Sequence, residues 1–173
     1  DDLVSKHIVS LQGTDKEEIT VSQLMFHESG MPSTLNTYAL MVDSTTFSGK
    51  LMSYKQKSPY TIKLDRGVYG NNTARRRTDV MHTKPSYGYE IEIARGIYGG
   101  DKMKSVISDA IYNSTLKEKK YLYSCLNFCM LKDMEEVLTG EPHEQYVHDY
   151  VFAPIGACHT MFNPAIKGYK VNV

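Results

Sequence analysis

Residues 121–140 read YLYSCLNFCMLKDMEEVLTG, and the interpretation of the whole chain starts from this stretch. Ser124 can cap a helix at its start and Gly140 can end it. Between them the apolar residues fall at helical spacing on one face, namely Leu126, Cys129, Met130, Met134, Val137 and Leu138. We therefore predict a helix here, with Tyr123 held one residue before the cap, where a helix start favours an anion.

The segments on either side also have helical patterns. Apolar residues within 1–11 predict a short amphipathic helix. Thr20 and Gln23 have the spacing of a capping box, which marks the start of a second helix. Asp101 can cap a further amphipathic helix, and Pro142 suits the first turn of another. These patterns favour a mainly α fold.

The middle of the chain has no such pattern. Residues 33–86 are rich in Ser, Thr, Gly, Tyr and Lys and show no sustained period, which predicts a long irregular excursion. The alternation between Tyr87 and Ile93 indicates either a short strand or the entry to a helix. We find no internal repeat. The prediction is one domain over residues 1–173, mainly α or at most α+β, with at most a short strand pair.

Composition excludes some classes of partner. The chain of 173 residues has 20 basic and 20 acidic side chains, so no overall field attracts nucleic acid or an anionic membrane. The one basic cluster, Arg75 to Arg77, indicates a solvated loop, with a phosphate site as the alternative. No apolar stretch approaches the roughly 20 residues of a membrane span, and we recognise no signal peptide.

Three segments resemble one known family. They are YSCLNF at 123–128, ITVSQLMFHESGMP at 19–32 and VFAPIGACHTMFNP at 151–164. Together they resemble serine β-lactamase-like hydrolases, which include class C β-lactamases, penicillin-binding DD-peptidases and related esterases. A looser resemblance is to the subgroup in which such a region is attached to a glycoside hydrolase. The resemblance implies the helical domain of a β-lactamase or DD-peptidase-like fold.

The resemblance also implies roles for single residues. Tyr123 matches the catalytic tyrosine of the family, which acts as a candidate base. Cys125 stands where the family most often has Asn or Asp, so amide or β-lactam turnover is in doubt even in a complete protein. Asn127 lies on a different helical face and is an unsafe substitute. The matched residues of structural role are His27, Ser29, Gly30, Pro154 and Gly156.

Two of the family's motifs are not found in this sequence. The Ser-x-x-Lys string at Ser114 and Lys117 lies where the family has a variable linker, so we interpret it as a coincidence. A Lys-Thr-Gly type motif is absent as well. A phenol ionises near pH 10 and becomes a base near neutrality only beside cations, which these motifs supply in the family. We expect a fragment that begins just after the catalytic serine and is not competent by itself.

Other functions remain open. A non-catalytic module of the same fold could bind glycan or peptide through its tyrosines, and Cys125 near a helix start could be a nucleophile, although buried thiols are the default for the cysteines. His143 and His148 have no metal-site spacing, so we expect neither a metal nor a cofactor. The expected partners are the remainder of the hydrolase or a second copy, with a cell-wall-derived or ester substrate in an exported, periplasmic parent.

Overall fold

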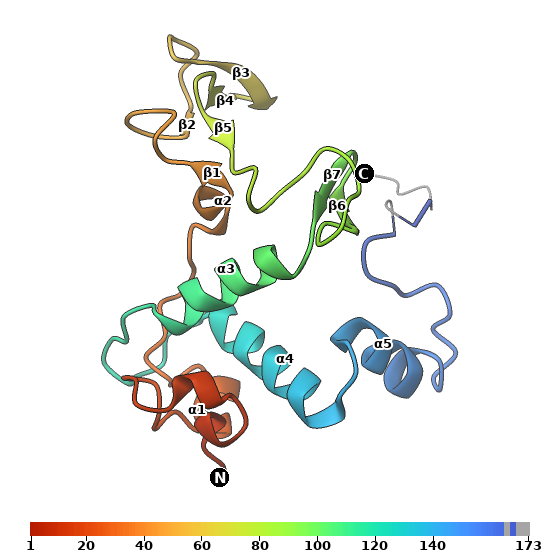
Figure 1. The fold of residues 1–173 in the computed structure, drawn as a ribbon. Coiled ribbons are helices and arrows are strands. Elements are labelled where there is room, and N and C mark those ends of the chain that lie inside the picture. Colours follow the sequence, from red (N-terminus) through yellow and green to blue (C-terminus); the bar gives the residue numbers. More distant parts are fainter. Residues whose placement is uncertain (165–166, 169–173) are drawn as a thin grey trace. The chain divides into compact units, whose positions relative to one another are not determined.

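The structure is a computed structural model, and it describes residues 1–164 and 167–168. The chain divides into two compact units, one of residues 1–35 and 108–173 and the other of residues 36–107. We refer to them as unit 1 and unit 2 and describe each by itself (Figure 1). That residues 1–173 form a single domain stays a prediction.

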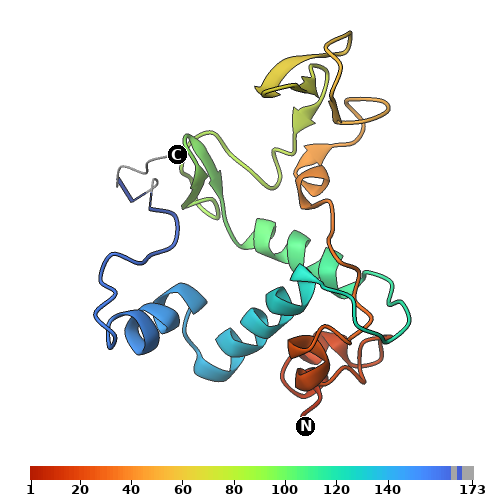
Figure 2. The same cartoon turned by 180° about the vertical axis from the view of Figure 1, so that it is seen from behind.

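Unit 1 is the helical unit. Its elements are η1 (Val4–Lys6), η2 (Val9–Leu11), α1 (Val21–Met25), α4 (Cys125–Thr139), α5 (His143–Val147) and the π-helical turn η3 (His148–Phe152). Helix α3 (Asp101–Tyr112) runs into it from unit 2. Helix α1 packs on α4, which in turn contacts α5, and both views of the ribbon show this order (Figures 1 and 2). The described residues contain no helix long and apolar enough to cross a membrane.

The core of unit 1 joins the first 31 residues to α4. Its fully or almost fully buried apolar residues are Val4, Ile8, Leu11, Ile19, Leu24, Met31, Ile111, Leu126 and Met130. The predicted helix at the start of the chain is two short 3-10 turns instead, η1 and η2. The capping box is confirmed, because the Thr20 hydroxyl accepts from the Gln23 amide and the Gln23 side chain accepts from the Thr20 amide. Burying apolar surface at these positions fixes the segment on α4.

Helix α4 begins and ends where the sequence predicts. It follows Ser124 and stops at Gly140, whose left-handed φ of 72° suits a residue without a Cβ. The predicted apolar face is only partly buried. Leu126 and Met130 lie in the core, whereas Val137 and Leu138 are 60% and 59% exposed. The second half of α4 therefore presents apolar side chains that the described residues of unit 1 leave more than half exposed.

Unit 2 contains short antiparallel sheets. After α2 (Thr37–Leu40), its strands are β1 (Val42–Asp43), β2 (Met52–Ser53), β3 (Tyr60–Asp65), β4 (Val68–Asn71), β5 (Arg75–Arg76), β6 (Ile91–Ala94) and β7 (Ile97–Gly99). They form the pairs β1 with β5 and β6 with β7, and a three-stranded sheet in the order β2, β4, β3. The strand alternative for the segment that ends at Ile93 is therefore confirmed by β6.

The hairpins β3–β4 and β6–β7 are built alike. In the first, Ile62 pairs with Gly70, Lys63 with Tyr69 and Asp65 with Val68; in the second, Ile91 pairs with Gly99, Glu92 with Tyr98 and Ala94 with Ile97. Every position in the second hairpin lies 29 residues after its counterpart, as Ile91 lies after Ile62. Each turn contains an Arg-Gly pair whose glycine has a φ of 70°. The prediction of no internal repeat is therefore wrong.

The predicted fold class is also wrong. Helices account for about 31% of the chain and strands for about 17%, with three small sheets, so the fold is α+β and not mainly α. Strands β1 to β5 all lie within residues 33–86, where an irregular excursion with at most one strand pair was expected. The strands are short and interrupted by bulges, so they leave no alternation long enough to read.

Candidate active site

Tyr123 lies directly before α4 with its side chain at the surface. The residue is 58% exposed, and within the described part of the chain its hydroxyl makes no hydrogen bond. Its ring lies against the imidazole of His27, with centroids 4.6 Å apart and planes tilted by 47°. Tyr112 contrasts with it, because burial and a 2.6 Å hydrogen bond to Asp133 raise the pKa of Tyr112 above its usual range. Of these two tyrosines, Tyr123 therefore has the phenol that a ligand can reach.

His27 fastens the backbone around Tyr123. It follows α1 with a φ of 59°, which is uncommon for a residue with a side chain. Its carbonyl oxygen accepts from the Leu122 amide at 2.9 Å, and its Nδ1 accepts from the Ser124 amide at 3.2 Å. The imidazole also meets the rings of Tyr121 and Phe128 edge-on. These contacts agree with a structural role for His27, which stays a prediction.

Ser29 and Gly30 pack the chain that follows α1. The Ser29 hydroxyl is buried, donates to Asn127 Oδ1 at 2.8 Å and accepts from the Met31 amide at 3.2 Å. Gly30 has a φ of 79°, and its carbonyl oxygen accepts from the Lys117 amide. A Cβ on Gly30 would lie 2.5 Å from the Lys117 carbonyl oxygen, so only glycine fits. The Ser29 hydroxyl is therefore not free for chemistry.

Ser124 occupies the cap position, but its side chain caps nothing. The buried hydroxyl donates instead to the Pro32 carbonyl oxygen at 2.7 Å, while the Cys125 amide donates to the Ser33 carbonyl oxygen at 3.1 Å. The start of α4 is thus tied to residues 32–33 by backbone and hydroxyl contacts. Such a tie between residues 92 apart could not be read from the local pattern.

Asn127 is the residue whose role sequence reasoning missed. It is fully buried; its Oδ1 accepts from Ser29, and its Nδ2 donates to the Leu24 carbonyl oxygen at 3.0 Å and lies 3.4 Å from His27 Nδ1. It therefore cannot stand in for the family's Asn or Asp. The available signal was an amide among the apolar residues of the first two turns of the helix, which needs a partner when buried.

The cysteines differ from the expectation of buried thiols. Cys125 and Cys158 are exposed, and Cys129 is half-buried. Cys125 is therefore accessible at the position of the family's Asn or Asp, and its role stays a prediction. Burial, followed by the charge of Asp133, raises the pKa of the Cys129 thiol, which disfavours its thiolate.

The Ser-x-x-Lys string makes no catalytic pair. The Ser114 hydroxyl is buried and donates to the Ile111 carbonyl oxygen at 2.7 Å, and the Lys117 side chain points to solvent. The cation beside Ser114 is Lys16, which is 1% exposed and donates from Nζ to the Ser114 carbonyl oxygen and to Asp15. That buried lysine fastens two distant segments and was not singled out in the sequence.

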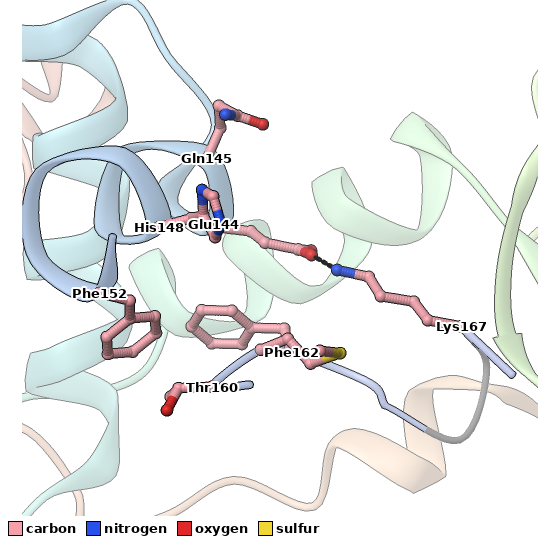
Figure 3. A pocket seen from close by; sticks show the side chains of 8 residues that line it. Glu144, Gln145, His148, Phe152, Thr160, Phe162 and Lys167 are labelled. Carbon is pink, nitrogen blue, oxygen red and sulfur yellow. Dashed lines mark hydrogen bonds and ion pairs between the residues drawn. The ribbon is translucent and has the colours of Figure 1, made fainter. Parts of the chain in front are cut away.

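The third matched segment borders a small cavity of about 200 Å3 in unit 1. Figure 3 shows its lining, with an ion pair between Glu144 and Lys167 and the aromatic side chains of Phe152 and Phe162. Pro154 and Gly156 are both exposed, and Gly156 has a φ of 74°. None of the residues that line this cavity was predicted to be catalytic.

The remaining charged candidates are engaged in pairs or exposed. His143 contacts Glu135 through Nδ1, and His148 contacts Asp149 in the same way. The described residues contain no group of three side chains suited to hold a metal. In unit 2 the guanidinium of Arg77 pairs with Asp79, while Arg75 and Arg76 are exposed on β5. The alternative of a phosphate site at these arginines stays a prediction.

Comparisons with known proteins agree with the quoted motifs. A model of the Beta-lactamase family matches residues 1–170. A protein of Escherichia coli (strain K12) named "Putative D-alanyl-D-alanine carboxypeptidase" is 39% identical over 51 residues, which are 30% of this chain and 12% of that protein. A protein of the same name from Salmonella schwarzengrund (strain CVM19633) is 36% identical over 50 residues, or 29% of this chain and 12% of that protein. The matches thus span about an eighth of these relatives, and no solved structure matches the chain.

Proposed function

This chain belongs to the Beta-lactamase family, and we propose that it supplies the tyrosine-bearing helical part of a serine hydrolase that transfers an acyl group to serine. One observation carries the proposal, namely the exposed phenol of Tyr123 at the start of α4, with His27 holding the backbone on both sides. A phenol so placed can take or return a proton once cations stabilise its phenolate. The substrate class is a β-lactam, a peptide or an ester.

We propose further that the chain is not competent by itself. The Ser114 hydroxyl is buried and bound to its own helix, so the one Ser-x-x-Lys string offers no nucleophile. The test is to incubate the 173-residue chain with fluorescent penicillin, nitrocefin and p-nitrophenyl esters. We expect neither covalent label nor turnover. Stoichiometric labelling that Tyr123→Phe abolishes would overturn this part of the proposal.

We expect the exposed apolar half of α4 to be covered by the rest of a hydrolase domain or by a second copy of the chain. The support is the uncovered second half of α4, with Val137 and Leu138 more than half exposed. Leaving a few hundred Å2 of apolar surface bare costs several kcal/mol at about 25 cal/mol per Å2. Light scattering should show self-association, or a hydrophobic dye should bind the monomer. A monomer that binds no dye would contradict it.

Export belongs to the same proposal, because a cell-wall-derived substrate lies outside the cytoplasm. Its measurement is fractionation of the producing cells with an antibody against the chain. Recovery of the protein only from the cytoplasm would refute export and leave the acyl-transfer chemistry untouched.

A second function is favoured by the aromatic side chains around His27. Tyr121, Tyr123 and Phe128 contact its ring and are 71%, 58% and 48% exposed. Exposed rings can stack on a sugar or a peptide, which fits a non-catalytic binding module. Titration calorimetry with muropeptides and chitooligosaccharides separates the two functions. Saturable heat that Tyr121→Ala removes would support binding, and the absence of heat with every ligand would exclude it.

A further inference from the structure

His27 binds the chain on both sides of Tyr123. Its carbonyl oxygen holds the Leu122 amide and its Nδ1 holds the Ser124 amide, so Tyr123 lies between two amides fastened to one residue. The tyrosine ring then rests on the imidazole at 4.6 Å between centroids. Two backbone tethers and one ring contact together leave the phenol little freedom of direction.

The hydrogen bonds also fix the tautomer of His27. A backbone amide can only donate, so Nδ1 carries the lone pair and the ring proton lies on Nε2. The Nδ2 group of Asn127 reaches the same nitrogen at 3.4 Å. Asn127 is itself oriented, because its Oδ1 accepts from Ser29 and its Nδ2 donates to Leu24. Every group that faces Nδ1 is therefore a donor held in place.

The backbone of His27 supports a specific role. Its φ of 59° lies in the left-handed region, which a residue with a side chain adopts only when its surroundings hold it there. We propose that His27 is a positioning residue for Tyr123, which sets the direction of the phenol without touching its hydroxyl. This rests on the proposed function, since only acyl transfer would use that direction.

Two substitutions at His27 separate the acceptor from the backbone conformation. Asn tolerates a positive φ and offers Oδ1 near the position of Nδ1. Gly accepts the same φ and removes both the acceptor and the ring. We expect His27→Asn to keep the Ser124 amide protected from hydrogen exchange. His27→Gly should speed that exchange about tenfold, because one hydrogen bond is lost.

NMR on the isotope-labelled chain gives both readouts without any catalysis. The aromatic signals of Tyr123 should move toward those of free tyrosine in His27→Gly, and the Gln23 amide in the capping box serves as the internal reference. An unchanged Ser124 amide in His27→Gly would overturn the proposal. If hydrogen exchange of the Gln23 amide also becomes fast in His27→Gly, the variant has lost more than one hydrogen bond and His27→Asn provides the test. An unprotected Ser124 amide in His27→Asn would then contradict the positioning role. These NMR readouts do not depend on acyl transfer, so they would stay the same if the proposed function were wrong.

A separate observation concerns unit 2, in which one backbone pattern occurs twice. Beyond the hairpins themselves, Ser53 pairs with Tyr69 as His82 pairs with Tyr98, and Lys57 bridges Tyr60 as Ser86 bridges Tyr89. Each counterpart again lies 29 residues further along. One register shift also falls at the same place in both hairpins, between Lys63 and Asp65 in the first and between Glu92 and Ala94 in the second. Two unrelated hairpins would not share the register, this shift and the outer bridges together.

The sequence carries the same correspondence. Identical residues at this spacing are Met52 and Met81, Lys55 and Lys84, Tyr60 and Tyr89, Ile62 and Ile91, Arg66 and Arg95, Gly67 and Gly96, Tyr69 and Tyr98, and Gly70 and Gly99. We infer that residues 52–70 and 81–99 are two copies of one segment, produced by a tandem duplication. Only the second copy continues directly into α3.

A deletion that fuses the two copies tests this inference. Removing residues 66–94 from the full chain joins Asp65 to Arg95, so the first strand of one copy meets the turn and second strand of the other. We expect one hybrid hairpin in which Ile62 pairs with Gly99, measured by cross-strand backbone NOEs. The control deletes residues 66–93, which leaves one extra residue and shifts the register. Absence of the hybrid pair, or its equal formation in the control, would overturn the duplication.

Discussion

Replacing Asn127 by Leu should destabilise unit 1 strongly. The side chain is fully buried and is bound to the Ser29 hydroxyl at 2.8 Å and to the Leu24 carbonyl oxygen at 3.0 Å. Leu has a similar volume, so the main effect is to leave the Ser29 hydroxyl proton without an acceptor and to remove one donor from the Leu24 carbonyl oxygen, which keeps the His27 amide at 3.3 Å. The unsatisfied buried donor costs about 1–3 kcal/mol and the lost hydrogen bond about 1 kcal/mol, so the expected loss is roughly 2–4 kcal/mol. That is a large part of the 5–15 kcal/mol typical of a domain.

Urea denaturation followed by circular dichroism measures this loss, and a double-mutant cycle assigns it. Ser29→Ala by itself also removes the acceptor of the Met31 amide, so it should destabilise as well. The double variant Ser29→Ala with Asn127→Leu should lose about 1–2 kcal/mol less than the sum of the two. Val137→Ala, at an exposed site of α4, is the control and should change stability by about 0.5 kcal/mol or less. A loss below about 1 kcal/mol for Asn127→Leu, or strict additivity, would refute the reasoning.

The remaining predictions concern the other ties within unit 1. Gly30→Ala should cost at least about 2 kcal/mol in thermal or urea denaturation, because the new Cβ meets the Lys117 carbonyl oxygen and φ is positive; a neutral change would refute it. Lys16→Met should cost about 1–3 kcal/mol by leaving the Ser114 carbonyl oxygen unpaired in the interior, and a stabilised variant would contradict this. The hydrogen bond from Lys16 lowers the pKa of Asp15 in the folded protein. The ionised carboxylate therefore stabilises the fold above the ordinary pKa of an aspartate, and this contribution is lost as the pH falls through the lowered pKa of the folded state. Urea midpoints of the wild type should therefore fall more steeply with acid than those of Lys16→Met, and parallel curves would count against the pair.

The sequence gives the family and the main helix because both depend on local signals. Helix α4 starts after Ser124 and stops at Gly140, as its cap residue and its glycine indicate. The capping box at Thr20 closes on Gln23 within the same few residues. Hydrogen bonds of this kind join neighbours in the chain, so the order of residue types is enough to predict them.

The predicted fold class was wrong because the strands of unit 2 give only a weak local signal. The strands of unit 2 are short, and their pairing was signalled by residues that recur at a fixed interval, such as the Arg-Gly pair at Arg66 and again at Arg95. A search for periodic hydrophobicity cannot detect a hairpin of a few residues with bulges. A search for self-similarity could have found it.

By itself, the sequence determined where α4 begins and ends, where α1 begins, and to which family the chain belongs. Only the tertiary structure showed that Asn127 is buried and bound to Ser29, that Lys16 is buried, and that His27 accepts a hydrogen bond from the backbone beside Tyr123. The physical reason is sequence separation. Each of these contacts joins residues close to 100 positions apart, and no local propensity states which distant polar group will satisfy a buried one.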